Sequence, residues 1–513
     1  MFPTLSFANW ELSSAQMGAR SAKAAGALAA AGIKEGDTIA IMMRNEPALM
    51  DVMLAARQLG AYITPLNWHF KAEEAGYILQ DSGAKVLVVH ADLLPQIAAG
   101  IPPAMRVFIA RPDPHVLKSY QNHALVPKDW HGAKDWQALL EEALPHRETT
   151  ARPLSLVAYT SGTTGSPKGI RRLPPSPDEA AALTQRMRAV ARAVSGITEA
   201  SRCLVSAPLY HSAPCGYAMF ASQSGAWLRI EPRFDAAETL ALIEQHRITH
   251  TYLVPTMFVR LLRLPAELRN RHDLSSVQFV SSTGAPCPPA IKEAMIDWWG
   301  EVINEAYASS ETGYLTLITS KEARERPGSA GRPIPGVSIK IIDDAGQEVP
   351  PGTIGKIYAC QTGLSQFTYI NRQDDRDAIE RDGYVTVGDI GHVDQDGYLF
   401  IADRRTDLVL SGGVNIYPAE IEQVLMVMPG VSDCAVFGIP DAEFGQALVA
   451  VVKATDGGVL TQEQVKQYLA SRLANFKVPR IVDFRDALPR EDTGKIFKRL
   501  LQEEYAALRQ AAS

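Results

Sequence analysis

One segment of ten residues limits what this chain can fold into more than any other part of the sequence. It reads Thr160-Ser-Gly-Thr-Thr-Gly-Ser-Pro-Lys-Gly169 and contains three glycines, five hydroxyl side chains and one lysine. The apolar run 154–158 directly before it predicts a strand. A segment with so few packing atoms adds little to a core, but its amides, hydroxyls and ammonium group can all face one polyanion. The pattern therefore predicts a phosphate-binding loop at the end of a strand.

This loop differs from a Walker loop, which needs G-x-x-x-x-G-K-S/T between a strand and a helix. Lys168 stands between Pro167 and Gly169, and the next residues, 170–175, include two prolines, which disfavour a helix that caps a phosphate. A flexible Gly/Ser turn is the alternative interpretation of this composition. The lysine and the strand in front of it favour the phosphate loop.

The segment resembles the signature loop of the adenylate-forming superfamily, which comprises acyl-CoA synthetases, luciferases and peptide-synthetase adenylation domains. That loop has the form S/T-S-G-S/T-T-G-x-P-K-G, and residues 160–169 match it at every position. Five further motifs follow in the superfamily's order, so the resemblance covers essentially the whole chain.

The chain has 513 residues, which is too long for one ordinary core and predicts at least two domains. A formal net charge of -6 gives no long-range attraction for nucleic acid or an anionic membrane, so a polyphosphate site has to be locally basic. The amino terminus lacks a signal-peptide pattern, and no apolar run is long enough for a membrane span. Five scattered cysteines favour isolated thiols, and we expect a cytoplasmic protein.

Strand and helix patterns alternate along most of the chain, which is typical of parallel sheets covered by helices. We expect an α/β fold in which residues 1–403 form a large N-terminal domain with two doubly wound subdomains and a small β-sheet subdomain. Residues 404–407 are the expected hinge, and residues 408–513 predict a small α+β C-terminal domain, which the resemblance implies is mobile.

Two local patterns give further structural expectations. Residues 103–152 are rich in Pro, His and charge and predict irregular surface. Asp235, followed three positions later by Glu238, predicts a capping box at the start of the helix 236–246.

Two motifs carry the groups that the resemblance assigns to ATP. Segment 305–313 resembles the Y-G-x-T-E motif, in which Tyr307 can stack on adenine and Glu311 suits Mg²⁺ on the phosphates. Segment 384–389 resembles the T-G-D motif, in which the carboxylate of Asp389 offers two acceptors to the ribose hydroxyls. The resemblance places the ATP and AMP contacts at Thr160, Ser161, Gly162, Thr163, Thr164, Gly165, Lys168, Gly284, Ala285, Pro286, Tyr307, Ser310, Asp389 and Arg404.

The resemblance also indicates an acyl pocket. His211 stands where carboxylate-activating members carry an aromatic or histidine gate, and Ala308 adds one methyl where glycine is usual. No aspartate in the pocket motifs could hold a substrate amine, which argues against an amino acid substrate. We expect a medium-chain, branched or aromatic acid, while steroid-like and long-chain acids stay open. The expected pocket residues are Tyr210, His211, Gly216, Tyr217, Gly284 and Ala308.

The C-terminal region carries the remaining motifs. Segment 489–496 matches the P-R-x-x-x-G-K-I element, whose lysine, Lys495, can bridge the attacking carboxylate and the α-phosphate. Segment 411–418 resembles the S-G-G-E-N-I-x-P loop of coenzyme A ligases, with Val414 in place of glutamate. Thr406 stands where the family hinge residue is usually Asp or Lys. The expected thioester loop comprises Ser411, Gly412 and Gly413.

These motifs imply an acyl-CoA synthetase that works in two half-reactions. Carboxylate and Mg·ATP give acyl adenylate and pyrophosphate, with Lys168, Glu311 and Lys495 as the catalytic groups, and coenzyme A then forms the thioester and expels AMP. In the family the small domain rotates between the two steps. The alternatives are an adenylate-forming enzyme without CoA transfer, either a fatty acyl-AMP ligase or a luciferase-like enzyme, and a non-catalytic nucleotide-binding regulator. A homodimer is left open.

Overall fold

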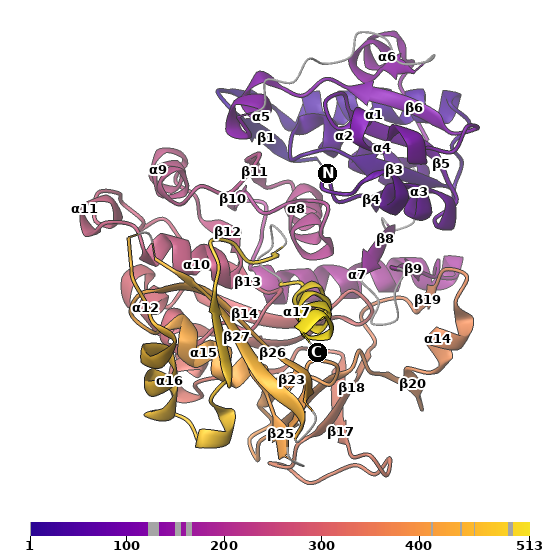
Figure 1. Ribbon diagram of the computed structural model, residues 1–513. Helices are drawn as coiled ribbons and strands as arrows, with labels where there is room; N and C mark the ends of the chain where they lie inside the picture. The colour runs from indigo at the N-terminus through magenta and orange to yellow at the C-terminus, as the bar shows by residue number, and fades with distance from the viewer. Residues whose placement is uncertain are drawn as a thin grey trace.

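The chain folds into two large mixed sheets and a smaller sheet, followed by a C-terminal unit that is coloured from orange to yellow in Figure 1. The N-terminal part of the chain, in indigo and purple, lies at the top of that view. The computed structural model describes residues 2–121, 133–148, 155–160, 167–411, 414–441, 444–455, 457–490 and 496–512.

The first large sheet has eight strands and carries the phosphate-loop hairpin at one side. Six of its strands run parallel to one another, in the order β8, β4, β3, β5, β6 and β7. Strand β9 pairs antiparallel with β8 on one side and with β19 on the other. Its order is β19 (Phe367–Tyr369), β9 (Lys168–Arg172), β8 (Ser155–Thr160), β4 (Tyr62–Pro65), β3 (Thr38–Met42), β5 (Ala84–His90), β6 (Arg106–Ala110) and β7 (Lys134–Asp135). Its helices are α1 (Ser14–Ala30), α2 (Pro47–Leu59), α3 (Ala72–Asp81), α4 (Leu94–Ile97), α5 (Pro114–Ser119) and α6 (Trp136–Glu142).

The second large sheet has nine strands, and its central strands are also parallel. Its order is β16 (Arg332–Pro333), β15 (Gly313–Ile318), β14 (Ile303–Ser309), β13 (Phe279–Ser282), β12 (His250–Leu253), β10 (Arg202–Val205), β11 (Trp227–Ile230), β1 (Thr4–Phe7) and β2 (Trp10–Leu12). Its helices are α7 (Pro177–Ser195), α8 (Ser212–Ser224), α9 (Ala236–His246), α10 (Pro255–Leu262), α11 (Ala266–Arg269), α12 (Pro289–Trp299) and α13 (Ser320–Glu325).

A smaller six-stranded sheet and the C-terminal unit complete the chain. The six strands are β17 (Val337–Ile342), β18 (Gly355–Gln361), β20 (Glu380–Arg381), β21 (Tyr384–Val385), β22 (Asp389–Val393) and β23 (Leu399–Arg404), with α14 (Gln373–Asp377) beside them in sequence. A hairpin of β24 (Val409–Ser411) and β25 (Val414–Ile416) follows. The C-terminal unit comprises α15 (Pro418–Met426), β26 (Val431–Asp441), β27 (Gly445–Ala454), α16 (Gln462–Ala470), β28 (Ile481–Phe484) and α17 (Lys498–Ala512).

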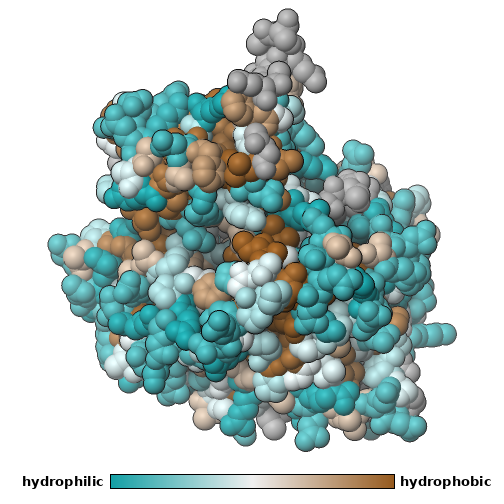
Figure 2. All heavy atoms as spheres, turned by 90° about the horizontal axis from the view of Figure 1, so that it is seen from below, coloured by the Kyte–Doolittle hydropathy of each residue, from teal (hydrophilic) through white to brown (hydrophobic). Residues whose placement is uncertain are grey.

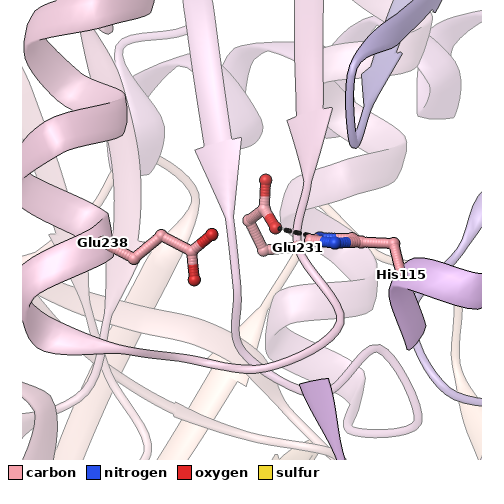
Figure 3. Close-up of side chains that lie close together, drawn as sticks. All are labelled: His115, Glu231 and Glu238. Carbon is pink, nitrogen blue, oxygen red and sulfur yellow. Dashed lines mark hydrogen bonds and ion pairs between the residues drawn. The ribbon is translucent and has the colours of Figure 1, made fainter. Parts of the chain in front are cut away.

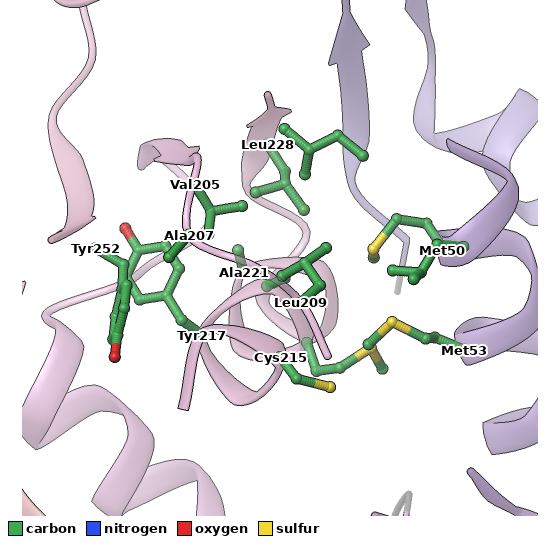
Figure 4. Close-up of a cluster of buried hydrophobic side chains, with 14 of the residues drawn as sticks. Met50, Met53, Val205, Ala207, Leu209, Cys215, Tyr217, Ala221, Leu228 and Tyr252 are labelled. Carbon is green, nitrogen blue, oxygen red and sulfur yellow. The ribbon is translucent and has the colours of Figure 1, made fainter. Parts of the chain in front are cut away.

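One hydrophobic core joins the two large sheets. Met50 and Met53 of α2 lie opposite Leu209, in the connection from β10 to α8, and Cys215 of α8 (Figure 4). These side chains are at most 2% exposed. Because burial of apolar surface is the main favourable term in folding, this shared core fixes the two sheets relative to each other.

Two local expectations need correction. Residues 103–152 are not uniformly irregular, because the apolar segment Val107–Ile109 lies within β6, which pairs with β5, and Trp136 of α6 is buried. The capping box is only half present. Asp235 accepts a hydrogen bond from the amide of Glu238 at 2.9 Å, but the Glu238 side chain turns toward His115 and Glu231 instead of its own cap.

The surface is largely hydrophilic in the view from below, where hydrophobic atoms gather beside a hollow near the middle (Figure 2). In the described part of the chain, no helix combines the length and the apolar character that a bilayer crossing needs. The exposed large hydrophobic side chains are scattered over the chain, at Trp10, Leu144, Leu173, Ile354, Leu410, Val414, Val427, Val459, Phe476 and Leu500.

Candidate active site

The two ends of the expected phosphate loop lie side by side, because Thr160 of β8 pairs with Lys168 of β9. The Nζ atom of Lys168 lies 3.0 Å from the carboxylate of Asp375 and 5.2 Å from the centre of the Tyr369 ring. A recess of about 780 Å³ is lined in part by Tyr369 and Asp375. The ammonium group of Lys168 is thus held between Asp375 and Tyr369, at the start of β9. The loop itself lies outside the described residues, and with it Ser161, Gly162, Thr163, Thr164 and Gly165.

Glu311 lies in the turn between β14 and β15, where groups from β19 and β9 meet it. The Tyr369 hydroxyl donates a hydrogen bond to Oε1 of Glu311 at 3.0 Å. Arg172 donates to the backbone oxygen of Ser310 at 2.9 Å. Burial lowers the pKa of Arg172 to about 10, and the charge of Glu311 opposes that shift. A carboxylate and a desolvated cation therefore face the same turn, which suits a site for charged phosphates.

Tyr307, Asp389 and Arg404 come together from three strands. The Tyr307 hydroxyl donates to Oδ2 of Asp389 at 2.5 Å, and Nε of Arg404 lies 3.3 Å from Oδ1. The second contact follows from the register, because Asp389 and Arg404 are paired residues of β22 and β23. Burial lowers the pKa of Arg404, but Asp389 and neighbouring acids outweigh that effect and raise it above its usual value. Asp389 is 6% exposed, so its carboxylate is held in one place between a phenol and a guanidinium.

The expected adenine-side loop follows β13. Gly284 has φ +98°, which an L residue rarely adopts, whereas an added Cβ would meet only Val254 at 3.9 Å. Glycine is therefore required here by backbone conformation and not by crowding. Ala285 is half-buried and Pro286 is exposed, so the loop lies at the surface of the fold beside the end of β14.

The expected acyl residues divide between α8 and β14. His211 is the N-cap residue of α8, and its ring lies 4.2 Å from that of buried Tyr210. The Oγ atoms of Ser212, at the start of α8, and Ser310 lie 3.2 Å apart, so α8 begins beside the turn that carries Glu311. Gly216 and Tyr217 lie one turn further along α8, and Ala308 pairs with Tyr314 in the β14–β15 ladder.

Sequence reasoning missed Tyr369 and Asp375. They follow Glu311 by roughly sixty residues, and no spacing rule links them to the phosphate loop. The apolar and aromatic character of 367–370 indicates a strand. Only the pairing of that strand with β9 brings Tyr369 beside Lys168.

Comparison with known proteins gives the family. A family model described as AMP-binding enzyme matches residues 3–366, and a second, AMP-binding enzyme C-terminal domain, matches residues 420–495. The chain belongs to the AMP-binding enzyme family. Among curated relatives, the long-chain-fatty-acid–CoA ligase FadD13 of Mycobacterium tuberculosis is 34% identical, over 96% of this chain and 93% of its own length. Feruloyl-CoA synthase of a Streptomyces species is 32% identical, over 95% and 92%. The solved structure of ATP-bound MatB from Rhodopseudomonas palustris has a TM-score of 0.83 at 28% identity, over 98% of this chain and 96% of its own.

This AMP-binding enzyme is an acid–CoA ligase, and its substrates are a carboxylic acid, ATP and coenzyme A. The prediction of an adenylate-forming acyl-CoA synthetase from the phosphate-loop motif is confirmed. The predicted α/β fold, with a large N-terminal and a small C-terminal domain, is confirmed as well.

Residues on the two sides of the expected hinge 404–407 are hydrogen-bonded to each other. Buried Asp403 accepts hydrogen bonds from the amides of Arg404 and of Ala419, at the start of α15. Desolvation raises the pKa of Asp403 to about 6, and Lys498 opposes the shift. Thr406 lies three residues beyond this contact and donates a hydrogen bond of 3.4 Å to Asp407.

For the catalytic motifs of the C-terminal part, the structure describes the flanking residues but not the central ones. Ser411 ends β24, and Gly412 and Gly413 lie outside the described residues, as does Lys495. Arg490 and Ile496, which flank the expected lysine loop, are paired by an antiparallel bridge.

A separate cluster of possible metal ligands lies away from these motifs. His115 of α5, Glu231 after β11 and Glu238 of α9 bring one ligand atom each to within 4.8 Å of one another (Figure 3). Nε2 of His115 lies 3.0 Å from Glu231, whose other oxygen lies 2.6 Å from Nε of Arg229. Because Arg229 already neutralises Glu231 and repels a cation, we interpret the cluster as an ion-pair bridge between the two large sheets.

Proposed function

We propose that this ligase activates a medium-chain, branched or aromatic carboxylic acid at a site formed by the β8–β9 hairpin, the β14–β15 turn and the β22–β23 pair. The observation that supports it best is the convergence of Tyr307, Asp389 and Arg404 in one hydrogen-bonded set. The two relatives named above differ in the acid that their names state, one a long-chain fatty acid and the other ferulate. Their names therefore do not identify the acid of this chain, and the proposal for the acyl class depends on the residues of its own pocket.

In this proposal each polar set handles one part of ATP. Asp389 accepts hydrogen bonds from the ribose hydroxyls, Arg404 contacts ribose and phosphate, and Tyr307 stacks on adenine beside the loop at Gly284. The phosphates lie between the loop before Lys168 and the turn at Ser310. Their negative charge releases Lys168 from Asp375, because a polyphosphate is a stronger partner than one half-exposed carboxylate.

Glu311 is the group that suits Mg²⁺. Its carboxylate is a hard oxygen ligand, and the hydrogen bond from Tyr369 to one oxygen fixes its orientation. When bound on the phosphates, Mg²⁺ neutralises part of their charge. The residues of this chain then have to align the acid carboxylate with the α-phosphate and offset the repulsion between the two anions, which is the role proposed for Lys495.

The second half-reaction involves the C-terminal part. We assign the thioester loop to Ser411, Gly412 and Gly413, and the pivot to Thr406 within the hinge 404–407 that separates domains 1–403 and 408–513. Asp403 supports this location, because it bonds to the first turn of α15 immediately before the hinge. A cytoplasmic location and a homodimer belong to the same proposal, and light scattering after size-exclusion chromatography tests the dimer.

The test measures pyrophosphate and AMP release with ATP, Mg²⁺ and a panel of carboxylic acids, with and without coenzyme A. We expect acid-dependent pyrophosphate, with AMP and thioester appearing only when coenzyme A is present. Lys495→Ala should lower acid-dependent pyrophosphate by at least about a hundredfold, the scale of a lost transition-state charge contact. Lys356→Ala is the control, because Lys356 pairs with Asp344 on the smaller sheet. Pyrophosphate release that coenzyme A leaves unchanged would contradict the thioester step, and no acid-dependent release across the panel would contradict the whole proposal.

A further inference from the structure

Asn45 is fully buried in the connection from β3 to α2, where the first large sheet meets the second. Its Nδ2 donates hydrogen bonds to the carbonyl oxygens of Ala207, at 2.8 Å, and of Glu231, at 3.0 Å. Its Oδ1 accepts a hydrogen bond from the amide of Leu209 at 2.8 Å. These three bonds use both amide hydrogens and the amide oxygen, so the partners fix the orientation of the Asn45 side chain.

Two of these contacts hold the segment 206–211, which connects β10 to α8. Ala207 and Leu209 flank Pro208, which has no amide hydrogen and whose ring fixes its own φ. Asn45 therefore holds the backbone on both sides of this proline. The side chains of Ala207 and Leu209 also pack in the shared core (Figure 4). The path of the chain up to Leu209 is thus set by contacts with residues that follow β3.

The next two residues, Tyr210 and His211, belong to the expected acyl pocket. The ring of Tyr210 meets the ring of Trp68, which follows β4, edge to face at 4.6 Å. The His211 ring lies 4.2 Å from the Tyr210 ring. Both pocket rings therefore extend from a backbone that the first sheet holds at Asn45, and Trp68 of the same sheet supports the Tyr210 ring directly.

The nucleotide groups lie on other elements. The partners of Asn45 belong to the connections that follow β10 and β11, whereas Lys168 lies on β9, Asp389 on β22 and Arg404 on β23. A displacement of the segment 206–211 should therefore affect the binding of the acid more than the binding of ATP.

We infer that Asn45 is a positioning residue for the acyl pocket, which sets Tyr210 and His211 from the first sheet together with Trp68. This inference rests on the proposed function, because it requires that the two pocket rings border the acid. It adds a residue that governs which acids are used without touching them. Such an indirect effect is physically reasonable, because a misplacement of about 1 Å caused by a distant residue can lower a rate by about a hundredfold.

The test measures acid-dependent pyrophosphate release with carboxylic acids of graded size, for wild type, Asn45→Asp and Asn45→Ser. Aspartate has nearly the same shape but lacks the amide donors, and serine is too short to reach all three partners. We expect kcat/KM for the acid that wild type prefers to fall by about tenfold or more, and the order of preference among the acids to change. KM for ATP should stay within about twofold of wild type, because the nucleotide groups keep their positions.

Ser276→Ala is the matched control for a loss of stability. It removes another buried hydrogen bond, from the Ser276 hydroxyl to the carbonyl oxygen of Ile248. This control should lower the melting temperature without changing the order of preference among the acids. Thermal unfolding is measured for every variant, and the kinetics are compared at a temperature at which each variant is folded.

A double-mutant cycle with His211→Ala tests whether Asn45 acts through the pocket rings. If it does, adding Asn45→Asp to His211→Ala should change the relative kcat/KM of the acids by less than about twofold further. An effect on stability alone would instead multiply the losses of the two single variants, because independent effects add in free energy. Trp68→Phe leaves Asn45 intact but weakens the other contact with Tyr210, and it should also change the acid preference more than KM for ATP.

The outcomes separate this inference from the proposed function. If no acid gives pyrophosphate with wild type, the proposed function fails. Acid-dependent release in wild type, with an unchanged order of acids or an equal loss for ATP in the Asn45 variants, overturns the inference alone. Independent effects of Asn45 and His211 in the cycle also overturn it. If neither Asn45 variant folds, an unchanged acid preference in Trp68→Phe overturns the positioning of the pocket from the first sheet.

Discussion

The nucleotide side and the acyl side of this ligase treat their polar groups in opposite ways. On the nucleotide side the groups already pair with one another, as in the contacts of Asp389 with Tyr307 and Arg404. On the acyl side the hydroxyl of Tyr217 is buried without such a partner. The groups on the first side are therefore oriented by one another before any substrate binds, whereas Tyr217 is held mainly by the apolar packing around it. This difference is expected where one substrate, ATP, is common to a family and the other distinguishes its members.

The largest expected effect comes from replacing Asp389, which lies at the centre of the hydrogen-bonded set on the nucleotide side. Asp389→Asn keeps the shape but loses the charge that Tyr307 and Arg404 contact. Hydrogen bonds to charged groups are worth about 1.5–3 kcal/mol each, so kcat/KM for ATP should fall by about a hundredfold. Pyrophosphate release at varied ATP concentration measures this kcat/KM. The control is Asp382→Asn, which makes the same change at an exposed position. A change of less than threefold would mean that Asp389 does not hold the ribose.

A smaller loss of activity should follow when the nucleotide side keeps its charged groups but loses one hydrogen bond that orients Glu311. Tyr369→Phe removes the donor to Glu311 and leaves the ring beside Lys168. We expect kcat/KM for ATP to fall about tenfold and the Mg²⁺ concentration for half-maximal rate to rise, because the carboxylate is no longer oriented.

The Mg²⁺ titration separates orientation from general damage to the fold. Tyr384→Phe is the matched control, because its hydroxyl accepts a hydrogen bond from Ser338 on the smaller sheet. A loss of rate in Tyr369→Phe with an unchanged Mg²⁺ requirement would contradict the orienting role.

On the acyl side, added volume should matter more than lost charge. Gly216→Ala places a Cβ in open space and should leave activity close to wild type. Gly216→Leu fills that space, and overfilling costs about 1–3 kcal/mol, so kcat/KM for the bulkiest acids should fall about tenfold with KM for ATP unchanged. Kinetics with acids of graded size measure both. Equal losses for small and bulky acids would show that Gly216 does not border the expected acyl pocket.

The two sides also differ in how far the sequence predicts them. Tyr307, Glu311, Asp389 and Arg404 lie in short motifs, so their residue types could be assigned to ATP before the fold was known. Tyr369 could not, because its role depends on β19 pairing with β9. No local pattern encodes that long-range pairing.

Other misses have the same physical origin. The sequence predicts the N-cap at Asp235 because capping is local, but it does not predict that Glu238 turns toward His115, more than a hundred residues earlier. In the same way, Ala308 was expected in the pocket, whereas its partner Tyr314 across the ladder follows only from the register of β14 and β15. Local chemistry is readable from sequence, and contacts made by sheet assembly are not.

The smallest effect concerns paired groups that lie away from both substrates. The hydrogen bond from His115 to Glu231, with the charges of Glu238 and Asp113, raises the pKa of His115 above 6.5, against the opposing effect of burial. The folded state thus binds the proton more tightly. The stabilisation is therefore fully present below pH 6.5, the unfolded value, and is lost as pH rises through the higher folded pKa.

His115→Gln keeps a hydrogen-bond donor but cannot titrate, so it isolates this contribution from other groups that titrate in the same range, such as Asp51, whose pKa burial raises to about 7. The melting temperature of the variant should lie below that of wild type by up to about 2 °C at pH 6, and the difference should vanish toward pH 9. KM for ATP and for the acid should not change. Such a result would show that the contact of His115 with Glu231 stabilises the packing of the two sheets, whereas the contacts of Asp389 position the nucleotide. A changed KM for ATP would instead tie the bridge to the active site, and a difference that grows with pH would reverse the assigned charge of His115.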